Sequence, residues 1–253
     1  MLTWIGSVAL LLLPQILAIP YLISHYRGTK PTAAVLFADK TFILIIVFGI
    51  VPAHALILLL AWAVATRLGK ISWRKALGWS WKPTFRLRQS VAVAILLFIV
   101  AMVVIYTFGG QETDLERLLQ SSRVAALAIA VIAATTAPLV EEVIYRGILY
   151  SALQRAMGPV LAIIVVTLMF AGLHVVQYWP DIGAISAIAF LSLAITVVRA
   201  RTGRLLPCFV IHLIFNGIQS LIIIFDPYIR ALYHLWRHDN VAGALTWIWR
   251  CLG

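Results

Sequence analysis

Long apolar runs are the feature that most limits what this chain can fold into. Hydrophobic residues make up 63% of the 253 residues and charged residues only 11%, which is far from the balance of a soluble globular protein. A run of about 18 or more apolar residues is long enough to cross the hydrocarbon core of a bilayer as a helix. The sequence therefore predicts an all-α, multi-pass membrane protein, a single bundle of about seven to eight transmembrane helices. In a bacterium such a protein would lie in the inner or plasma membrane.

Several segments are long enough to cross. With about 20 residues per crossing, the expected spans are Leu2–Ile23, Thr41–Ala65, Ser90–Phe108, Val124–Arg155, Val160–Val176, Ile182–Val198 and Leu205–Phe225. The first of these has no basic residue before it and is long, so we expect a retained span and not a cleaved signal peptide.

The fourth segment is too long for one straight crossing. At 1.5 Å per residue a helix over 124–155 would extend roughly 48 Å. Pro138 interrupts this segment, and proline is tolerated in the first turn of a helix but not in its middle. We therefore expect a break or kink there, with a new helix beginning near Pro138.

The charged residues predict an orientation in the membrane. The net charge of +11 comes from 20 Lys and Arg against 9 Asp and Glu. Lys and Arg, without any Asp or Glu, occur in the loop 66–89, at Arg155 and in the turn Arg199–Arg204. The end of the bundle that carries these segments is expected to face the cytoplasm. The acids gather in the opposite loops, at Glu112, Asp114, Glu116, Asp181 and Asp226. One loop disagrees, because Arg27, Lys30 and Lys40 should lie on the acidic side if the first two spans both cross fully. Either the first segment is not a simple crossing, or this loop is an exception to a statistical rule.

This asymmetry explains the positive charge better than nucleic-acid binding does, so the expected partner is membrane lipid and no nucleic acid is expected.

The sequence pattern divides the chain into three regions. Residues 1–123 hold N-terminal transmembrane helices and the basic cytoplasmic loop, and residues 124–225 hold a polar-containing core. Residues 226–253 form an interfacial or short transmembrane tail that is rich in tryptophan. Cys208 and Cys251 have no local partner, so no disulfide framework is predicted.

A small group of polar side chains stands inside the predicted spans of the core. They are Glu141, Glu142, Arg146, His174, His212 and Asn216. An ionisable side chain at the bilayer centre costs at least about 2.5–3.5 kcal/mol, so such residues usually mark a functional site. Glu142 and Arg146 are four residues apart and share a helix face, whereas Glu141 points about 100° away. A carboxylate base, imidazoles and an amide donor together suit the hydrolysis of an amide bond.

These residues also carry a resemblance. The sequences Glu141-Glu142-Val-Ile-Tyr-Arg146, Phe170-Ala-Gly-Leu-His174 and His212-Leu-Ile-Phe-Asn216 resemble, in order, the three motifs of the CPBP family. This family comprises CAAX proteases and bacteriocin-processing proteins, is also called Abi, and includes the type II CAAX prenyl endopeptidases. The resemblance covers about 124–225. It implies an intramembrane endopeptidase acting on a membrane-associated protein or peptide, including prenylated CAAX-type ones.

The resemblance also implies roles for the residues. Glu141 would activate the attacking water, His174 would help to hold that water, and His212 with Asn216 would stabilise the oxyanion. Glu142 and Arg146 would form a supporting ion pair. If the reaction depends on a divalent metal such as zinc, its ligands would be Glu141, His174 and His212. The sequence has no His-Glu-x-x-His run, so metal dependence stays open.

Other interpretations remain at this stage. The chain could be a non-enzymatic membrane partner, such as a bacteriocin self-immunity protein, and such a protein would tolerate the loss of Glu141. A proton-coupled transporter would also use membrane acids and histidines, but it would show broken helices in two matching halves. Buried histidines are commonly structural, and His54, isolated beside Pro52 in the second span, is interpreted in that way.

Overall fold

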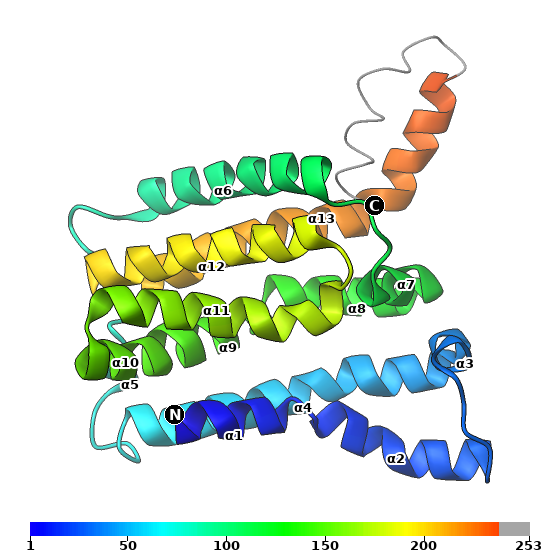
Figure 1. Cartoon of the computed structure of the whole chain (residues 1–253), viewed down its shortest axis with the longest axis horizontal. Coiled ribbons are helices and arrows are strands. Elements are labelled where there is room, and N and C mark those ends of the chain that lie inside the picture. Colours follow the sequence, from blue (N-terminus) through cyan, green and yellow to red (C-terminus); the bar gives the residue numbers. More distant parts are fainter. Residues whose placement is uncertain (238–253) are drawn as a thin grey trace.

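The protein is a bundle of long helices that run roughly along one direction (Figure 1). It is seen in a computed structural model that describes residues 1–237. In this part of the chain seven helical segments are long and apolar enough to cross a membrane, and no strand is present. The predicted all-α, multi-pass membrane fold is thus confirmed. The spans are Leu2–Tyr26, Lys40–Ala65, Leu87–Phe108, Arg123–Met157, Pro159–Tyr178, Ile182–Thr202 and Leu206–Arg230.

Short helices interrupt or connect the long ones. The elements are, in chain order, α1 (Leu2–Leu10), α2 (Leu13–Tyr26), α3 (Ala33–Ala38), α4 (Lys40–Ala65), α5 (Trp73–Leu77), α6 (Leu87–Phe108), α7 (Asp114–Ser121), α8 (Arg123–Ala134), α9 (Thr136–Glu141), η1 (Glu142–Leu149), α10 (Tyr150–Met157), α11 (Pro159–Tyr178), α12 (Ile182–Thr202) and α13 (Leu206–Arg237). The tail expected at 226–253 begins as a continuation of α13, and its residues 238–253 lie outside the described part.

The predicted break in the fourth span is confirmed. α8 ends at Ala134, and Thr135 departs from helical geometry with φ −124° and ψ −76°. The next helix, α9, begins at Thr136, which places Pro138 in its first turn as expected. From Glu142 to Leu149 the helix widens to π geometry before α10 continues it. π-helical turns are rare and frequently occur at functional sites.

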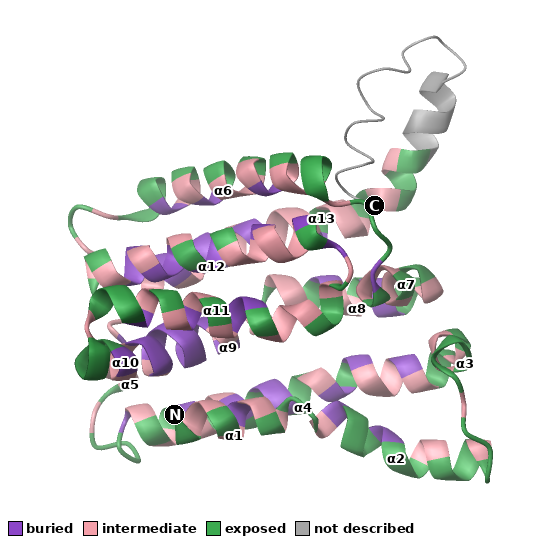
Figure 2. Ribbon diagram, viewed as in Figure 1, coloured by how far each residue is buried: buried purple, intermediate pink, exposed green. Residues whose placement is uncertain are grey.

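Two large apolar clusters hold the bundle together, beside a small third one between α4 and α8. One joins α4, η1, α10 and α11 around residues such as Ile57, Val143 and Phe170. The other joins α6, α12 and α13 around Ala94, Leu191 and Phe215. Figure 2 shows buried positions facing the inside of the bundle and exposed ones outside it. Many of the outward side chains are large and apolar, as a surface in contact with lipid requires.

The two ends of the bundle differ in charge. Because successive spans alternate in direction, the connection from α4 to α6, Arg155 and the α12–α13 turn meet at one end, which we call the basic end (Figure 1). At the other, acidic end lie α7, the α11–α12 turn and Asp226. The loop with Arg27 and Lys30 also lies at the acidic end, beside α3, so it is the exception that the sequence indicated.

At the acidic end, two glycines allow α6 and α12 to approach closely. A Cβ added to Gly183 would lie 2.6 Å from the backbone nitrogen of Gly109 and 2.8 Å from its Cα. Close helix approach through small residues is a common packing device in membranes. We predict that Gly183→Ala lowers the stability of the detergent-solubilised protein by about 1–3 kcal/mol, the usual cost of overpacking, measured as a fall in Tm.

The matched control for this prediction is Gly172→Ala. Gly172 also lies inside a helix, but a Cβ there would meet no atom within 4 Å. The control should leave Tm unchanged or raise it slightly, because alanine favours helices over glycine by up to about 1 kcal/mol. Equal Tm values for the two variants would contradict the close packing of α6 on α12.

Candidate functional site

The site is organised around a buried ion pair. Arg146 and Glu142 are both fully buried in η1, and Arg146 Nη1 donates to Glu142 Oε1 at 2.9 Å. The sequence predicted that these two residues meet. Taking both charges out of water is expensive, and the mutual attraction compensates only when the remaining hydrogen-bonding groups are also satisfied. Each guanidinium nitrogen of Arg146 has a partner, whereas Glu142 Oε1 accepts two contacts and the buried Glu142 Oε2 has no hydrogen-bond partner in the described part of the chain.

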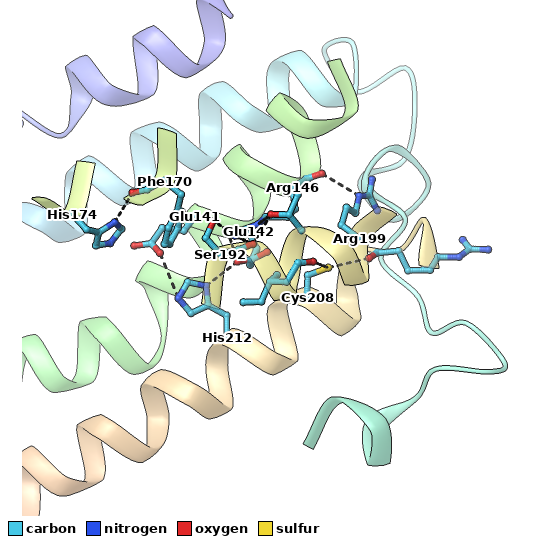
Figure 3. A network of polar contacts seen from close by, with 12 residues as sticks. Glu141, Glu142, Arg146, Phe170, His174, Ser192, Arg199, Cys208 and His212 are labelled. Carbon is cyan, nitrogen blue, oxygen red and sulfur yellow. Dashed lines mark hydrogen bonds and ion pairs between the residues drawn. The ribbon is translucent and has the colours of Figure 1, made fainter. Parts of the chain in front are cut away.

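Arg146 ties η1 to α12. Its Nε donates to Thr196 Oγ1 at 3.1 Å, and its Nη2 donates to the carbonyl oxygen and the hydroxyl of Ser192 at 2.9 and 2.8 Å. The guanidinium carbon also lies 4.7 Å from the centre of the Phe170 ring on α11, which allows a cation–π contact. One side chain thereby fixes the positions of η1, α11 and α12 (Figure 3).

His212 on α13 links the two glutamates. Its Nδ1 lies 2.8 Å from Glu142 Oε1, and its Nε2 lies 3.6 Å from Glu141 Oε2. An ionised carboxylate only accepts hydrogen bonds, so Nδ1 carries the proton that is donated to Glu142. This bond orients the ring and directs Nε2 toward Glu141. The separation of 3.6 Å is longer than a direct hydrogen bond.

The two adjacent glutamates have different environments. The side chain of Glu142 is 0% exposed, whereas that of Glu141 is 24% exposed. Glu141, His174 and His212 border a cavity of about 260 Å³. Figure 3 shows the Glu141 carboxylate between the two imidazoles, with Arg146 farther along the chain and away from them. The two carboxylates thus approach different nitrogens of the His212 ring, and only that of Glu141 borders the cavity.

His174 is fixed by its own helix. Its Nδ1 lies 2.8 Å from the carbonyl oxygen of Phe170 one turn earlier. Because a carbonyl oxygen accepts, Nδ1 carries the proton and Nε2 is left with a lone pair. The ring packs between Phe170, at 4.6 Å between ring centres, and Tyr178, at 6.4 Å. These rings form one wall of the cavity.

Asn216 also borders the cavity, one turn beyond His212 on α13. Its Nδ2 donates to the carbonyl oxygen of Ala133 at 3.1 Å. Ala133 lies at the end of α8, where the break at Thr135 separates α8 from α9. The amide therefore connects α13 to the broken helix, and it uses one of its two hydrogens to do so.

The residues present do not fit a metal ion as they stand. Among the side chains that the structure describes, those of residues 1–230, no group of three or more His, Cys, Asp or Glu lies close enough to hold one. Of the expected ligands, His212 directs Nδ1 to Glu142 and Nε2 toward Glu141. We therefore derive no chemical step through a metal.

Sequence reasoning missed the residues that support Arg146. Ser192 and Thr196 are small polar residues four apart on α12, and Arg199 follows less than one turn later. Their spacing on an otherwise apolar span was the available signal, because such residues share a helix face. His54 on α4 is 7% exposed and its Nδ1 lies 2.9 Å from Thr136 Oγ1 at the start of α9, in agreement with a structural role.

We predict that Arg146→Gln lowers stability by about 3–5 kcal/mol, because it leaves the buried Glu142 carboxylate without its guanidinium. The measurement is Tm in detergent, with Arg155→Gln as the matched control on exposed α10. The double variant Glu142→Gln with Arg146→Gln should recover part of the loss. If Arg146→Gln and Arg155→Gln have the same Tm, the buried pair does not organise the core.

Comparison with known proteins agrees with this site. Residues 123–218 match the family described as type II CAAX prenyl endopeptidase Rce1-like. The match runs from the start of α8 into α13 and contains all six polar residues of the site. It covers less than half of the chain and confirms the resemblance carried by the three motifs. Neither a curated protein nor a solved structure was found that matches the chain.

Proposed function

Since residues 123–218 match the type II CAAX prenyl endopeptidase Rce1-like family, we propose that the protein hydrolyses a peptide bond of a membrane-associated protein or peptide inside its cavity. The observation that carries this proposal is the contrast between the two adjacent glutamates. Glu142 is fully buried and paired with Arg146, while Glu141 is accessible from the cavity next to two histidines. An accessible carboxylate held in a mostly apolar site is suited to act as a general base.

In the proposed reaction, Glu141 takes a proton from a water molecule while the water oxygen attacks the carbonyl carbon of the substrate. The carbon–oxygen double bond opens and leaves a tetrahedral oxyanion. When the carbon–nitrogen bond breaks, the proton on Glu141 is delivered to the leaving nitrogen. His174 offers the lone pair of Nε2 as an acceptor for the second hydrogen of the water, which positions its oxygen.

The developing oxyanion needs donors on the opposite side of the reacting carbon. We assign these to His212 and Asn216, which border the same cavity. With Nδ1 donating to Glu142, a second proton at Nε2 makes His212 a cation between two carboxylates, and that proton is then available to the oxyanion. Asn216 contributes the amide hydrogen that is not bonded to Ala133. Glu142 and Arg146 act by positioning His212.

We predict that Glu141→Gln lowers the cleavage rate by about 10²–10⁴-fold, the usual contribution of a general base, with an unchanged Tm. Purified protein would be tested on a panel of lipidated and transmembrane peptides, with mass spectrometry of the products. The matched control is Glu112→Gln, the same chemical change at an exposed residue of the acidic end. Full activity of Glu141→Gln would overturn the assignment of the base.

The same cleavage assay is repeated in the presence of a strong chelator. A glutamate mechanism without a metal predicts that strong chelators leave the cleavage rate unchanged. Loss of cleavage that zinc restores would show that a metal takes part, and the roles of Glu141 and His174 would then need revision. A folded wild-type protein that cleaves no peptide of the panel would favour the non-enzymatic binding partner.

A further inference from the structure

The cavity extends from the proposed reaction centre in one direction only. Beyond Glu141 and His212 its wall continues along α6, α12 and α13, and it reaches the acidic end of the bundle. The lining residues at that end are Gly110, Thr113, Leu115, Glu116, Tyr178 and Asp181. None of the lining residues comes from the loop 66–89, from α10 or from the α12–α13 turn. The cavity therefore approaches the acidic surface and not the basic one.

The position of His174 along its helix agrees with this direction. His174 lies four residues before the end of α11 at Tyr178, and fifteen residues after its start at Pro159. At 1.5 Å per residue it is about 6 Å from the acidic end and about 22 Å from the basic end. A water molecule held by His174 is thus close to the acidic surface.

The basic end is closed by a group of hydrogen bonds from the Arg199 side chain and from the backbone, which we call the seal. Arg199 is buried and donates to the carbonyl oxygens of Arg146, Leu77 and Gly203, at 3.1, 3.2 and 2.9 Å. Leu205 donates from its backbone nitrogen to the carbonyl oxygen of Gly78 at 3.0 Å. These contacts join the α5 loop to η1 and to the α12–α13 turn. Figure 3 shows the contact between Arg199 and Arg146.

The contacts at the basic end are closely packed. A Cβ on Gly78 would lie 2.9 Å from the carbonyl oxygen of Gly203, and Leu77 beside it is 1% exposed. Glu142 and Arg146, both 0% exposed, stand between this seal and Glu141. These buried side chains separate the carboxylate of Glu141 from the basic end.

The charges assign a side of the membrane to each end. The basic end carries Lys and Arg without a single Asp or Glu, and the acids of the described chain lie at the acidic end, apart from Glu141 and Glu142. Short loops rich in Lys and Arg remain in the cytoplasm. The acidic end carries six Lys and Arg (Arg27, Lys30, Lys40, Arg117, Arg123 and Arg230) and the basic end eleven, so the excess of Lys and Arg, which is what decides the orientation, lies at the basic end.

From these observations we propose that substrates enter the cavity from the acidic, non-cytoplasmic side of the membrane. The substrate class is then a peptide segment exposed on that side, such as a translocated segment next to a membrane anchor, and not the C-terminus of a cytoplasmic protein. This inference rests on the proposed hydrolase function. Its two elements, orientation and entry route, can be measured separately.

Orientation is tested with two single-cysteine sites in the full chain, in a Cys251→Ser background that keeps the buried Cys208. Leu115→Cys places a thiol at the acidic end and Arg155→Cys places one at the basic end. A membrane-impermeant maleimide applied to intact expressing cells should label Leu115→Cys, and should label Arg155→Cys only after the membrane is permeabilised. The reverse pattern would overturn the proposal.

The entry route is tested with the same two variants after purification. Coupling a bulky polyethylene-glycol maleimide to Leu115→Cys should lower peptide cleavage about tenfold or more, because the label obstructs the mouth, while a label on Arg155→Cys should leave the rate within about twofold. Each labelled protein is compared with its own unlabelled form. Undiminished cleavage by labelled Leu115→Cys, or loss of cleavage in labelled Arg155→Cys, would overturn entry from the acidic side and leave the hydrolase function standing.

Absence of cleavage in the unlabelled parent has a different meaning. It would overturn the proposed function, and the substrate class inferred here would fall with it. The labelling pattern in cells would still decide the orientation, because it needs no activity. The two failures are therefore distinguishable.

Discussion

Arg146 is a guanidinium without contact to solvent, and the geometry of the site depends on how its charge is compensated. Its contacts reach Glu142 on the same helix, Ser192 and Thr196 on α12, and the ring of Phe170 on α11. A buried charge tolerates little displacement, since each lost partner leaves an unsatisfied group in a low dielectric. The helices that carry the motifs are thereby held in one arrangement.

This arrangement gives two neighbouring glutamates different surroundings. Glu142 accepts from Arg146 and from His212, so it orients the imidazole whose other nitrogen is directed toward Glu141. A carboxylate that orients an imidazole through its Nδ1 also occurs in hydrolases of unrelated folds. The layer around Arg146 and Arg199 also separates the cavity from the basic end. The same buried contacts therefore hold the site residues in place and close one end of the cavity.

Much of the fold was predictable because lipid imposes a simple constraint. The length and apolarity of the segments predict the seven spans, and the proline at 138 predicts the interruption of the fourth. The pair Glu142 and Arg146 was predictable from its spacing of four, because this pairing is local to one helix. Ser192, Thr196 and Arg199 were not, since their partners lie about fifty or more residues away in the sequence.

The sequence by itself determined a helical membrane protein, the order of three polar motifs, the resemblance they carry and the difference in charge between the two sets of loops. These properties depend on composition and on spacing within single helices. Only the tertiary structure decided which glutamate borders the cavity, which partner each imidazole nitrogen has, and at which end the cavity is closed. Those features depend on how helices distant in sequence pack around a buried charge, and no local pattern records such contacts.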